Sequence, residues 1–431
     1  MCMDEVRKAA ERAKLASLRL QSMSSLLRNS ALKEVAISLK RNEGAIVKAN
    51  QIDLENAEKG NLAMPLLKRL KYDHMKVEES MAQIESLVRQ EDPIGRSISK
   101  TELDEGLVLD KVTTPIGVVA VIFESRPDAL VQISTLCIKS GNAVILKGGS
   151  EAKETNSALA QAIVEGVLRA NEGFKDAVQL MSTREEVREL LDQDDLVDLI
   201  IPRGSNQLVR SIQESTRIPV LGHSAGVCHT YVDEDADIEM AVKVAFDAKC
   251  QYPAVCNAME TLLVHEGIAK ALLPRMAKKY AEAQVEIRGD EKTRKIIRAN
   301  EATEDDWSAE YNDLILSVKI VSSLEEAVGH INKYGSHHTD AIITKEEGKA
   351  KRFMDTVDSA SVLWNCSTRF ADGFRYGLGA EVGISTNKTH ARGPVGLEGL
   401  VIYKYRLSGK GHVVADYAGD DAKQFTHRKI K

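Results

Sequence analysis

The chain has 431 residues, of which 43% are hydrophobic and 4% aromatic, a composition typical of a globular protein of two or three domains. Its 64 acidic and 58 basic residues leave a formal net charge of −6 with no block of like charge, which disfavours nucleic acids and membrane surfaces as partners. The six cysteines form no CxxC pair, as expected of free thiols in a reducing cytoplasm, and no apolar run is long enough to span a bilayer.

The first 95 or so residues are predicted to be helical, because apolar residues recur at spacings of three and four and glycine and proline are scarce. The opening twenty residues are basic and amphipathic, as in a transit peptide. Three acidic residues among them, Asp4, Glu5 and Glu11, indicate the first helix of the fold instead. The stretch 98–114 alternates in polarity around Asp-Glu-Gly and predicts a β-hairpin.

From residue 115 to about 245, apolar strands alternate with amphipathic helices, which predicts a doubly wound parallel sheet of the α/β class. The loops ESRPD (124–128), KGGSEA (147–152) and PRGSN (202–206) each follow a predicted strand. Ligands bind beyond the carboxyl ends of such strands, so we expect the three loops to line one cleft. A second α/β alternation follows, and the tail predicts two strands around Ser-Gly-Lys-Gly outside the compact body.

Two of these loops have the character of phosphate sites. KGGSEA and PRGSN each lead into a helix and carry a cation, Lys147 or Arg203, beside backbone N–H groups that an anion can accept. Each is equally well explained as a tight turn from strand to helix. Neither contains the GxGxxG fingerprint, so the residues alone leave a nucleotide site open.

Histidines occur in two short motifs. HSAGVCH (223–229) places two histidines near Cys228, but the spacing fits no standard zinc pattern, so we expect a β-turn between strands and no metal site. His337 and His338 are expected in a loop between a helix and a strand, and contact with solvent or substrate is the less favoured of their two interpretations.

The segment 368–396 is rich in glycine and contains Arg369, Arg375 and Arg392. Its aromatic residues favour a structured loop over a disordered one. Guanidinium groups there are suited to holding a carboxylate or phosphate by paired hydrogen bonds, although exposed arginines with packed stems explain the pattern as well.

Cys256 stands in QYPAVCNAMETLLVH (251–265), between a proline turn and an apolar run. A thiol at such a place serves either as a small core residue or as a nucleophile. The local pattern alone leaves both interpretations open.

Several segments together resemble the γ-glutamyl phosphate reductase family of the aldehyde dehydrogenase superfamily over nearly the whole chain. They are VIFESRPDALVQI, LKGGSEA, DLIIPRGSNQLVRSI, PVLGHSAGVCHTYVDEDAD, YPAVCNAMETLLVH and the loop 368–396. The run VSSLEEAVGHINKYGSHHTDAI (321–342) fits that family's signature. The chain resembles the stand-alone form of the family rather than its fusion with a glutamate 5-kinase, which implies functional coupling to a separate kinase.

The resemblance implies an aldehyde dehydrogenase-like architecture in three parts. A Rossmann-like NADP-binding domain would comprise residues 1–97 and 115–245, and an α/β catalytic domain residues 246–398. Residues 98–114 and 399–431 would form an arm of hairpin and strands that makes a homo-oligomer.

The implied reaction is the NADPH-dependent reduction of γ-glutamyl phosphate to glutamate 5-semialdehyde, the second step of proline biosynthesis. By this comparison Cys256 is the nucleophile that forms a thioester. The oxyanion would be held by the Cys256 backbone N–H together with Arg126 or Asn257.

The comparison also implies the binding residues. The loop of Lys147, Gly149 and Ser150 would hold the adenosine ribose or its 2′-phosphate, Gly204 and Ser205 the pyrophosphate and nicotinamide, and Glu310 the nicotinamide ribose. Glu151 would instead bond a free 2′-hydroxyl if the cofactor were NAD. The substrate anions would be bound by Arg369, Arg375, Arg392 and His223.

One departure from hydrolytic aldehyde dehydrogenases is informative. Those enzymes carry a water-activating glutamate in a LELGG-like stretch, whereas the matching stretch here is VLGHSAG, with Gly222 at the corresponding place. The missing base disfavours a hydrolytic aldehyde dehydrogenase, and the intact Cys256 segment disfavours the other alternative, a nucleotide-binding scaffold without chemistry.

Overall fold

The computed structural model describes residues 2–181, 183–223 and 225–430. Helices open the chain, as predicted: α1 (Cys2–Leu20), α2 (Ser25–Arg41), α3 (Glu43–Lys59), α4 (Met64–Leu70) and α5 (His74–Arg89). Side-chain caps set two of the starts, because Ser24 accepts a hydrogen bond from the N–H of Leu27 and Asp73 from that of Lys76.

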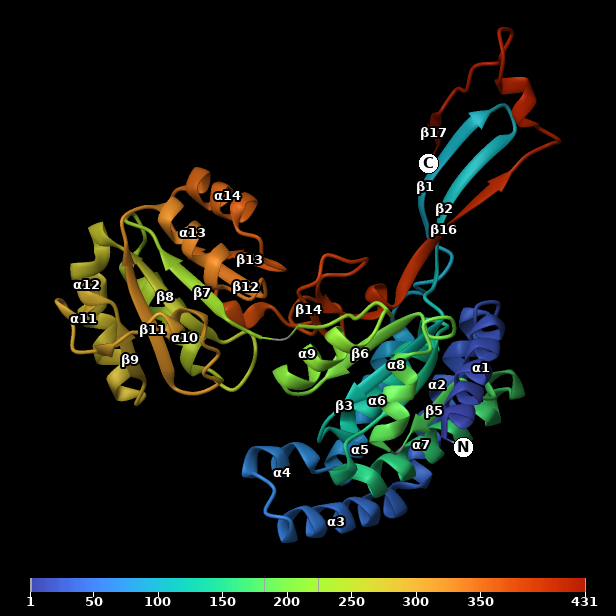
Figure 1. Ribbon diagram of the computed structural model, residues 1–431, viewed down its shortest axis with the longest axis horizontal. Coiled ribbons are helices and arrows are strands. Elements are labelled where there is room, and N and C mark those ends of the chain that lie inside the picture. The colour runs from blue at the N-terminus through green and yellow to red at the C-terminus, as the bar shows by residue number, and fades with distance from the viewer. Residues whose placement is uncertain (1, 182, 224, 431) are drawn as a thin grey trace.

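The first sheet is parallel and has the strand order β5-β4-β3-β6. Its elements are β3 (Val118–Phe123), α6 (Pro127–Lys139), β4 (Ala143–Lys147), α7 (Lys153–Ala170), β5 (Val178–Met181), α8 (Arg184–Leu191), β6 (Leu199–Arg203) and α9 (Asn206–Ser215). A capping box between Thr183 and Glu186 starts α8. These strands and helices pack with α1, α2 and α5 (Figure 1), and their buried side chains form one continuous apolar core.

The second sheet is also parallel, in the order β10-β9-β11-β8-β7-β12-β13. Its elements are β7 (Cys228–Val232), α10 (Ile238–Cys250), β8 (Met259–His265), α11 (Glu266–Glu282), β9 (Glu286–Gly289), α12 (Glu291–Arg294), β10 (Asn300–Glu301), β11 (Ile315–Val321), α13 (Leu324–Tyr334), β12 (Thr339–Ile343), α14 (Glu347–Thr356) and β13 (Ser361–Trp364). Separate apolar clusters lie on its two sides.

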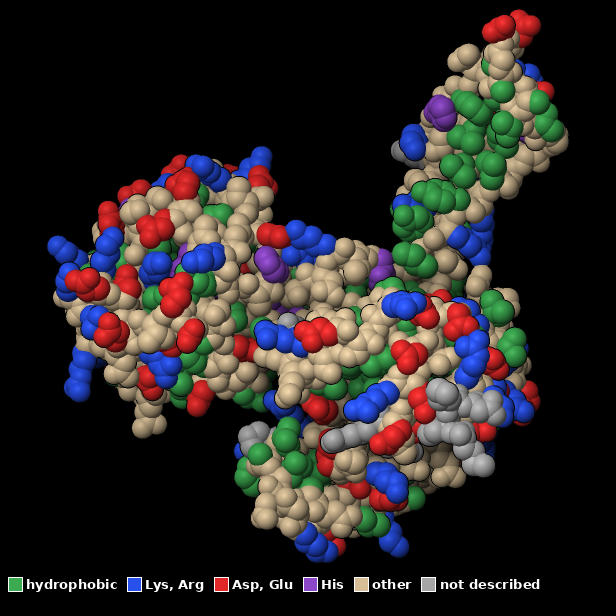
Figure 2. Space-filling view, in the orientation of Figure 1, with side chains coloured by type: hydrophobic (Ala, Val, Ile, Leu, Met, Phe, Trp, Pro, Cys, Tyr) green, Lys and Arg blue, Asp and Glu red, His purple; other side chains and the backbone are tan. Residues whose placement is uncertain are grey.

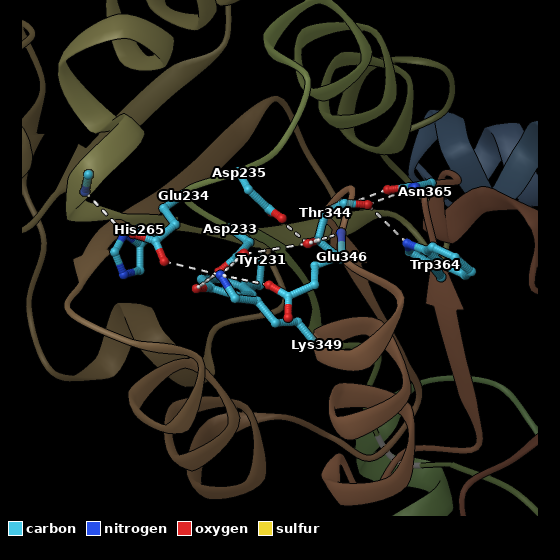
Figure 3. A network of polar contacts seen from close by, with 11 residues as sticks. Tyr231, Asp233, Glu234, Asp235, His265, Thr344, Glu346, Lys349, Trp364 and Asn365 are labelled. Carbon is cyan, nitrogen blue, oxygen red and sulfur yellow. Dashed lines mark hydrogen bonds and ion pairs between the residues drawn. The ribbon is translucent and has the colours of Figure 1, made fainter.

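The sheet's carboxyl edge is closed by a polar network (Figure 3). Asp233, just after β7, accepts hydrogen bonds from the Tyr231 hydroxyl at 2.8 Å and from Lys349 at 2.7 Å. Thr344, just after β12, donates to Asp235 at 2.6 Å. These hydrogen bonds link the loops at the carboxyl edge of the sheet to one another. The amino edge of the sheet faces the loops of the first sheet.

The arm is an antiparallel sheet in the order β16-β2-β1-β17 that projects from the body (Figure 1). It contains the predicted hairpin, β1 (Ser97–Asp104) and β2 (Leu107–Pro115), with β16 (Val401–Ser408) and β17 (Arg428–Ile430). Of the two strands predicted on either side of residues 408–411, the first forms as β16. In place of the second, Val414–Tyr417 make a short 3-10 turn. Figure 2 shows apolar side chains gathered on the arm.

Two expected boundaries differ from the structure. We expected the second unit to begin at residue 246, but β7 pairs with β8 and β12, so its sheet already begins at residue 228. We expected it to continue to residue 398, but Val382, Val395 and Leu397 are buried in the core of the first sheet. That stretch, with the ribbon β14 (Gly383–Ser385) and β15 (Gly393–Val395), returns to the first body because its apolar side chains pack there.

Among the described helices, none combines the length and the apolar content that a bilayer-spanning segment needs.

Candidate active site

Cys256 lies in the turn between α10 and β8, at the amino end of its strand. Strand β7 runs between β8 and β12, with Cys228 opposite Met259 and His229 opposite Asp340. This parallel register brings the residues just before β8 and β12 to one edge. The loops that follow β3 and β6 of the first sheet approach the same place, so the site joins carboxyl ends of one sheet to amino ends of the other.

Two histidines face the thiol. The Sγ atom of Cys256 and a ring nitrogen from each of His223 and His338 all lie within 4.8 Å of one another. The two rings meet edge to face with their centroids 4.9 Å apart. Cys256 and His223 are half-buried, whereas His338 is fully buried.

Hydrogen bonds orient both rings. His223 donates from Nδ1 to the carbonyl oxygen of Ile384 at 2.8 Å, and burial lowers the pKa of its imidazole. The neutral ring therefore presents its Nε2 lone pair. His338 contacts the Thr339 hydroxyl through Nδ1 at 2.9 Å, while its buried Nε2 has no hydrogen-bond partner.

The back of the nucleophile turn is held by close packing. The Cys228 thiol donates to the carbonyl oxygen of Cys256 at 3.1 Å, and burial raises the pKa of Cys228. Gly226 lies so near that a Cβ atom built on it would be 2.5 Å from the Cα atom of Cys256. Only glycine fits this approach.

A buried ion pair brackets the same turn. Lys249, near the end of α10, donates to the Glu260 carboxylate on β8 at 2.6 Å, and both side chains are fully buried. Burial raises the pKa of Glu260 to about 7, against the opposing effect of Lys249. The amide of Asn257 donates to the carbonyl oxygen of Ala371 at 2.8 Å, which ties the turn to the segment after β13.

Arginines make the surroundings of Cys256 positive. Burial lowers the pKa of Arg203, with a further contribution from Arg126, and Cys256 acts in the opposite direction. Burial also lowers the pKa of Arg369, and Arg375 lowers it further, whereas Cys256 again acts in the opposite direction. A thiolate at Cys256 and the guanidinium groups of Arg203 and Arg369 therefore attract one another. The Glu381 carboxylate also raises the pKa of Arg203, so it offsets part of this positive charge.

The other two arginines of the loop 368–396 have local partners. Arg392 contacts the Asp358 carboxylate at 3.1 Å and also donates to the backbone oxygens of Asp358 and Thr386. Arg375 lies 3.4 Å from Asp372. Arg369 is buried and donates to Gln251 at 2.9 Å.

The expected cofactor residues lie on loops after β4 and β6. Lys147 ends β4 and is half-buried, Gly149 is half-buried and Ser150 is exposed. At the start of α9, the Ser205 N–H donates to the Glu124 carboxylate at 2.9 Å, and Gly204 packs against that same carboxylate. Asn206 donates to Glu310 at 2.7 Å, so this helix start is joined to the second unit.

Known proteins match the chain over nearly its whole length. The aldehyde dehydrogenase family profile matches residues 2–304. A γ-glutamyl phosphate reductase of Pelotomaculum thermopropionicum is 61% identical over 99% of this chain and 98% of its own length. One from Acetivibrio thermocellus is 56% identical, over 98% and 97%. The chain belongs to the γ-glutamyl phosphate reductase family. The crystal structure of the Thermotoga maritima γ-glutamyl phosphate reductase matches with a TM-score of 0.93 at 39% identity, covering 95% of this chain and 99% of that one.

For a member of this family, the structure brings together some of the expected site residues and separates others. Cys256, Asn257, Arg369 and His223 converge at one place, and Gly204, Ser205 and Glu310 meet around the start of α9. Arg392, by contrast, is engaged with Asp358. The β-turn expected at residues 223–229 is wrong. Residues 223 and 225–227 have no turn, Cys228 and His229 begin β7, and Ser224 lies outside the described residues.

Sequence reasoning missed three residues of the site. Arg203 was noted only as a cation beside a loop, His338 only as one of two loop histidines, and Gly226 was not singled out. The position of His338 directly before an apolar strand, like that of Cys256, was the available signal.

Proposed function

We propose that this chain catalyses the NADPH-dependent reduction of γ-glutamyl phosphate to glutamate 5-semialdehyde and phosphate, the second step of proline biosynthesis from glutamate. The observation that carries the proposal is the half-buried Cys256, which is held on a rigid turn and surrounded by cationic side chains. Such a site suits attack by sulfur on an acyl phosphate, whose negative charge the arginines attract.

The chain's own residues account for acyl transfer. The Cys256 thiolate attacks the γ-carbonyl carbon, the C–S bond forms, and the C–O bond to phosphate breaks, so that phosphate leaves with the electron pair. The oxyanion formed on attack would accept hydrogen bonds from the Cys256 backbone N–H and from Arg126 or Asn257. One amide hydrogen of Asn257 is already used by Ala371, which fixes the side chain without consuming its second hydrogen.

Substrate anions have candidate partners around this centre. Arg369, Arg203 and Arg126 supply positive charge for the leaving phosphate and the α-carboxylate. Arg375 and His223 would complete the pocket. We assign Arg392 a structural role in the loop 368–396, since its guanidinium group donates hydrogen bonds to Asp358.

The residues expected to hold the dinucleotide fit that group. At the amino end of α9 the Ser205 N–H donates to the Glu124 carboxylate, and a pyrophosphate oxygen would use the same donor once that carboxylate has turned away. Lys147, Gly149 and Ser150 would hold the adenosine ribose with its 2′-phosphate, and Glu310 the nicotinamide ribose. When bound, NADPH supplies the hydride that reduces the thioester to the aldehyde level.

A preference for NADP over NAD is supported by the position of Glu151. Its carboxylate accepts hydrogen bonds from the N–H and the hydroxyl of Ser125, each at 2.6 Å. Both bonds use Oε1, so Ser125 holds one of the two carboxylate oxygens that a ribose 2′-hydroxyl would need as an acceptor. Lys147 and Ser150 would then be the cation and the hydroxyl that bind a 2′-phosphate.

The arm is proposed to join copies of the chain into a homo-oligomer. Its strand β16 exposes Tyr403, Tyr405 and Leu407, with 44%, 60% and 58% of their surfaces accessible (Figure 2). Exposed apolar side chains in a row on a projecting sheet are typical of an interface. Cys137, Cys228, Cys250, Cys256 and Cys366 are free, which fits a reducing cytoplasm. A separate glutamate 5-kinase would supply the acyl phosphate.

The reverse reaction tests the function. Purified chain is given pyrroline-5-carboxylate, which is in equilibrium with glutamate 5-semialdehyde, and NADP⁺, with and without inorganic phosphate. We expect NADPH to form only when phosphate is present. Phosphate-independent formation would identify a hydrolytic aldehyde dehydrogenase, and no formation under either condition would reject dehydrogenase activity on this aldehyde.

A further inference from the structure

Three potential metal ligands converge on the nucleophile. The Sγ atom of Cys256 and one ring nitrogen each of His223 and His338 lie within 4.8 Å of one another. In addition, the Nε2 atom of His338 is buried and has no hydrogen-bond partner, an arrangement that leaves a polar atom unsatisfied. Thioester chemistry with a hydride donor uses no metal, and the proposed function gives no part to the unpartnered Nε2 atom of His338.

The ligand types select the metal. One thiolate and two imidazoles are the set that Zn²⁺ prefers, whereas Mg²⁺ and Ca²⁺ require oxygen ligands. The backbone oxygen of Ile384 and the hydroxyl of Thr339 engage the Nδ1 atoms of His223 and His338. This is the outer support that metal-binding histidines commonly have, and it directs each Nε2 atom to a metal.

The spacing is close to what zinc requires. Zn–S and Zn–N bonds of about 2.3 Å and 2.0–2.1 Å place tetrahedral ligands roughly 3.3–3.6 Å apart. Drawing the ligand atoms together from 4.8 Å or less therefore closes each separation by no more than about 1.5 Å. Cys256 and His223 are half-buried, so rotation of their side chains can supply the adjustment.

We propose that Cys256, His223 and His338 form a reversible Zn²⁺ site whose fourth position is open to water, and that bound zinc blocks the nucleophile. The thiol gives its proton to solvent as the Zn–S bond forms, and no oxidation state changes. The guanidinium groups of Arg203 and Arg369 repel a cation, which weakens binding and makes the site an inhibitory one rather than a structural one. Only the inhibition rests on the proposed function; zinc binding itself does not.

Zinc binding is tested without substrate, on the full-length chain, by competition with a chromophoric zinc chelator. The parent and a control, Cys366→Ser, should bind one more zinc ion per chain than Cys256→Ser, or bind it at least roughly tenfold more tightly. Cys366 is half-buried in the turn after β13 and lies outside the three-residue set. Equal zinc binding by the parent and Cys256→Ser would overturn the proposal.

Cobalt and alkylation identify the ligands. The parent with Co²⁺ should show a thiolate-to-metal charge-transfer band that Cys256→Ser lacks, and His223→Gln, at a half-buried position, should weaken zinc binding. Zinc should slow iodoacetamide labelling of Cys256 but not of Cys366, as measured by peptide mass spectrometry. Absence of the cobalt band, or unchanged labelling of Cys256 at saturating zinc, would refute the site.

The reverse assay then separates the two hypotheses. Zinc that binds and inhibits, with activity restored by chelator, supports both. Zinc that binds to a chain without phosphate-dependent activity supports the metal site and rejects the proposed function. An active chain that zinc neither binds nor inhibits rejects the metal site alone.

Discussion

Replacing Gly226 by alanine tests whether the position of the Cys256 backbone determines the rate. The new methyl group would lie 2.5 Å from the Cα atom of Cys256 and 2.7 Å from its Cβ atom, and it would also overlap its carbonyl oxygen. Carbon atoms pack favourably at about 3.5–4.0 Å, so the nucleophile turn must retreat by roughly 1 Å. A displacement of that size at a reacting centre lowers the rate about 100-fold, which corresponds to about 2.7 kcal/mol.

The matched control is Gly222→Ala, in the same segment between α9 and β7. Its methyl group would meet nothing nearer than the Cγ atom of Pro202, at 3.4 Å, an ordinary contact. Neither glycine has a left-handed φ, so neither substitution strains the backbone. The two variants therefore differ in whether the new atom displaces Cys256.

The assay is kcat/KM for phosphate-dependent NADP⁺ reduction, with NADPH affinity and thermal melting measured on the same samples. We expect Gly226→Ala to lose about 100-fold in kcat/KM while it keeps its NADPH affinity, and Gly222→Ala to stay close to the parent. A folded Gly226→Ala variant with the parent's kcat/KM would refute the argument that this close approach positions the nucleophile.

Further predictions concern the nucleophile, the substrate anion, the missing base and a buried histidine. Cys256→Ser should abolish turnover yet retain NADPH binding, because an alcohol at neutral pH is a far poorer nucleophile than a thiol; activity at the parent rate would reject a covalent mechanism. Arg369→Ala should lower kcat/KM by roughly 10- to 150-fold, the effect of losing one charge-assisted contact, and unchanged kinetics would remove it from the site. Gly222→Glu should permit some phosphate-independent oxidation of the semialdehyde; a folded variant wholly dependent on phosphate would show that the missing glutamate is not what prevents hydrolysis. Burial lowers the pKa of His330 from 6.5 to about 2. Below pH 6.5 the unfolded chain therefore binds a proton on this imidazole and the folded chain does not, so the free energy of unfolding falls as the pH falls. The slope is at most about 1.4 kcal/mol per pH unit, and urea titrations of His330→Gln should give a flatter profile; parallel profiles would contradict this.

Much of the fold could be predicted because its causes are local. The spacing of apolar residues predicted the opening helices and the alternating strands, and the polarity pattern of residues 98–114 predicted the hairpin. The boundary at residue 245 could not be read in this way. Strand β7 is buried like β6, and only its pairing with β8 and β12 assigns it to the second sheet.

The candidate site was only partly predictable. Cys256 could be singled out from its segment together with the family resemblance, and it proves to be half-buried beside two histidines. The roles given to Arg369 and His223 remain predictions. The tail shows the opposite case, because residues 412–417 have the composition of a strand, yet they join no sheet and Val414–Tyr417 form a 3-10 turn.

By itself, the sequence determined the α/β class, the two successive alternations of strand and helix, the projecting arm and the cysteine at the start of an apolar strand. These follow from residues within a few positions of one another, whose side chains select the backbone conformation directly. Only the tertiary structure decided that His223 and His338 meet at Cys256 and that Glu310 meets the start of α9. Those contacts depend on the register of parallel strands and on the packing of one body against the other, because residues far apart in the chain become neighbours only when both are fixed.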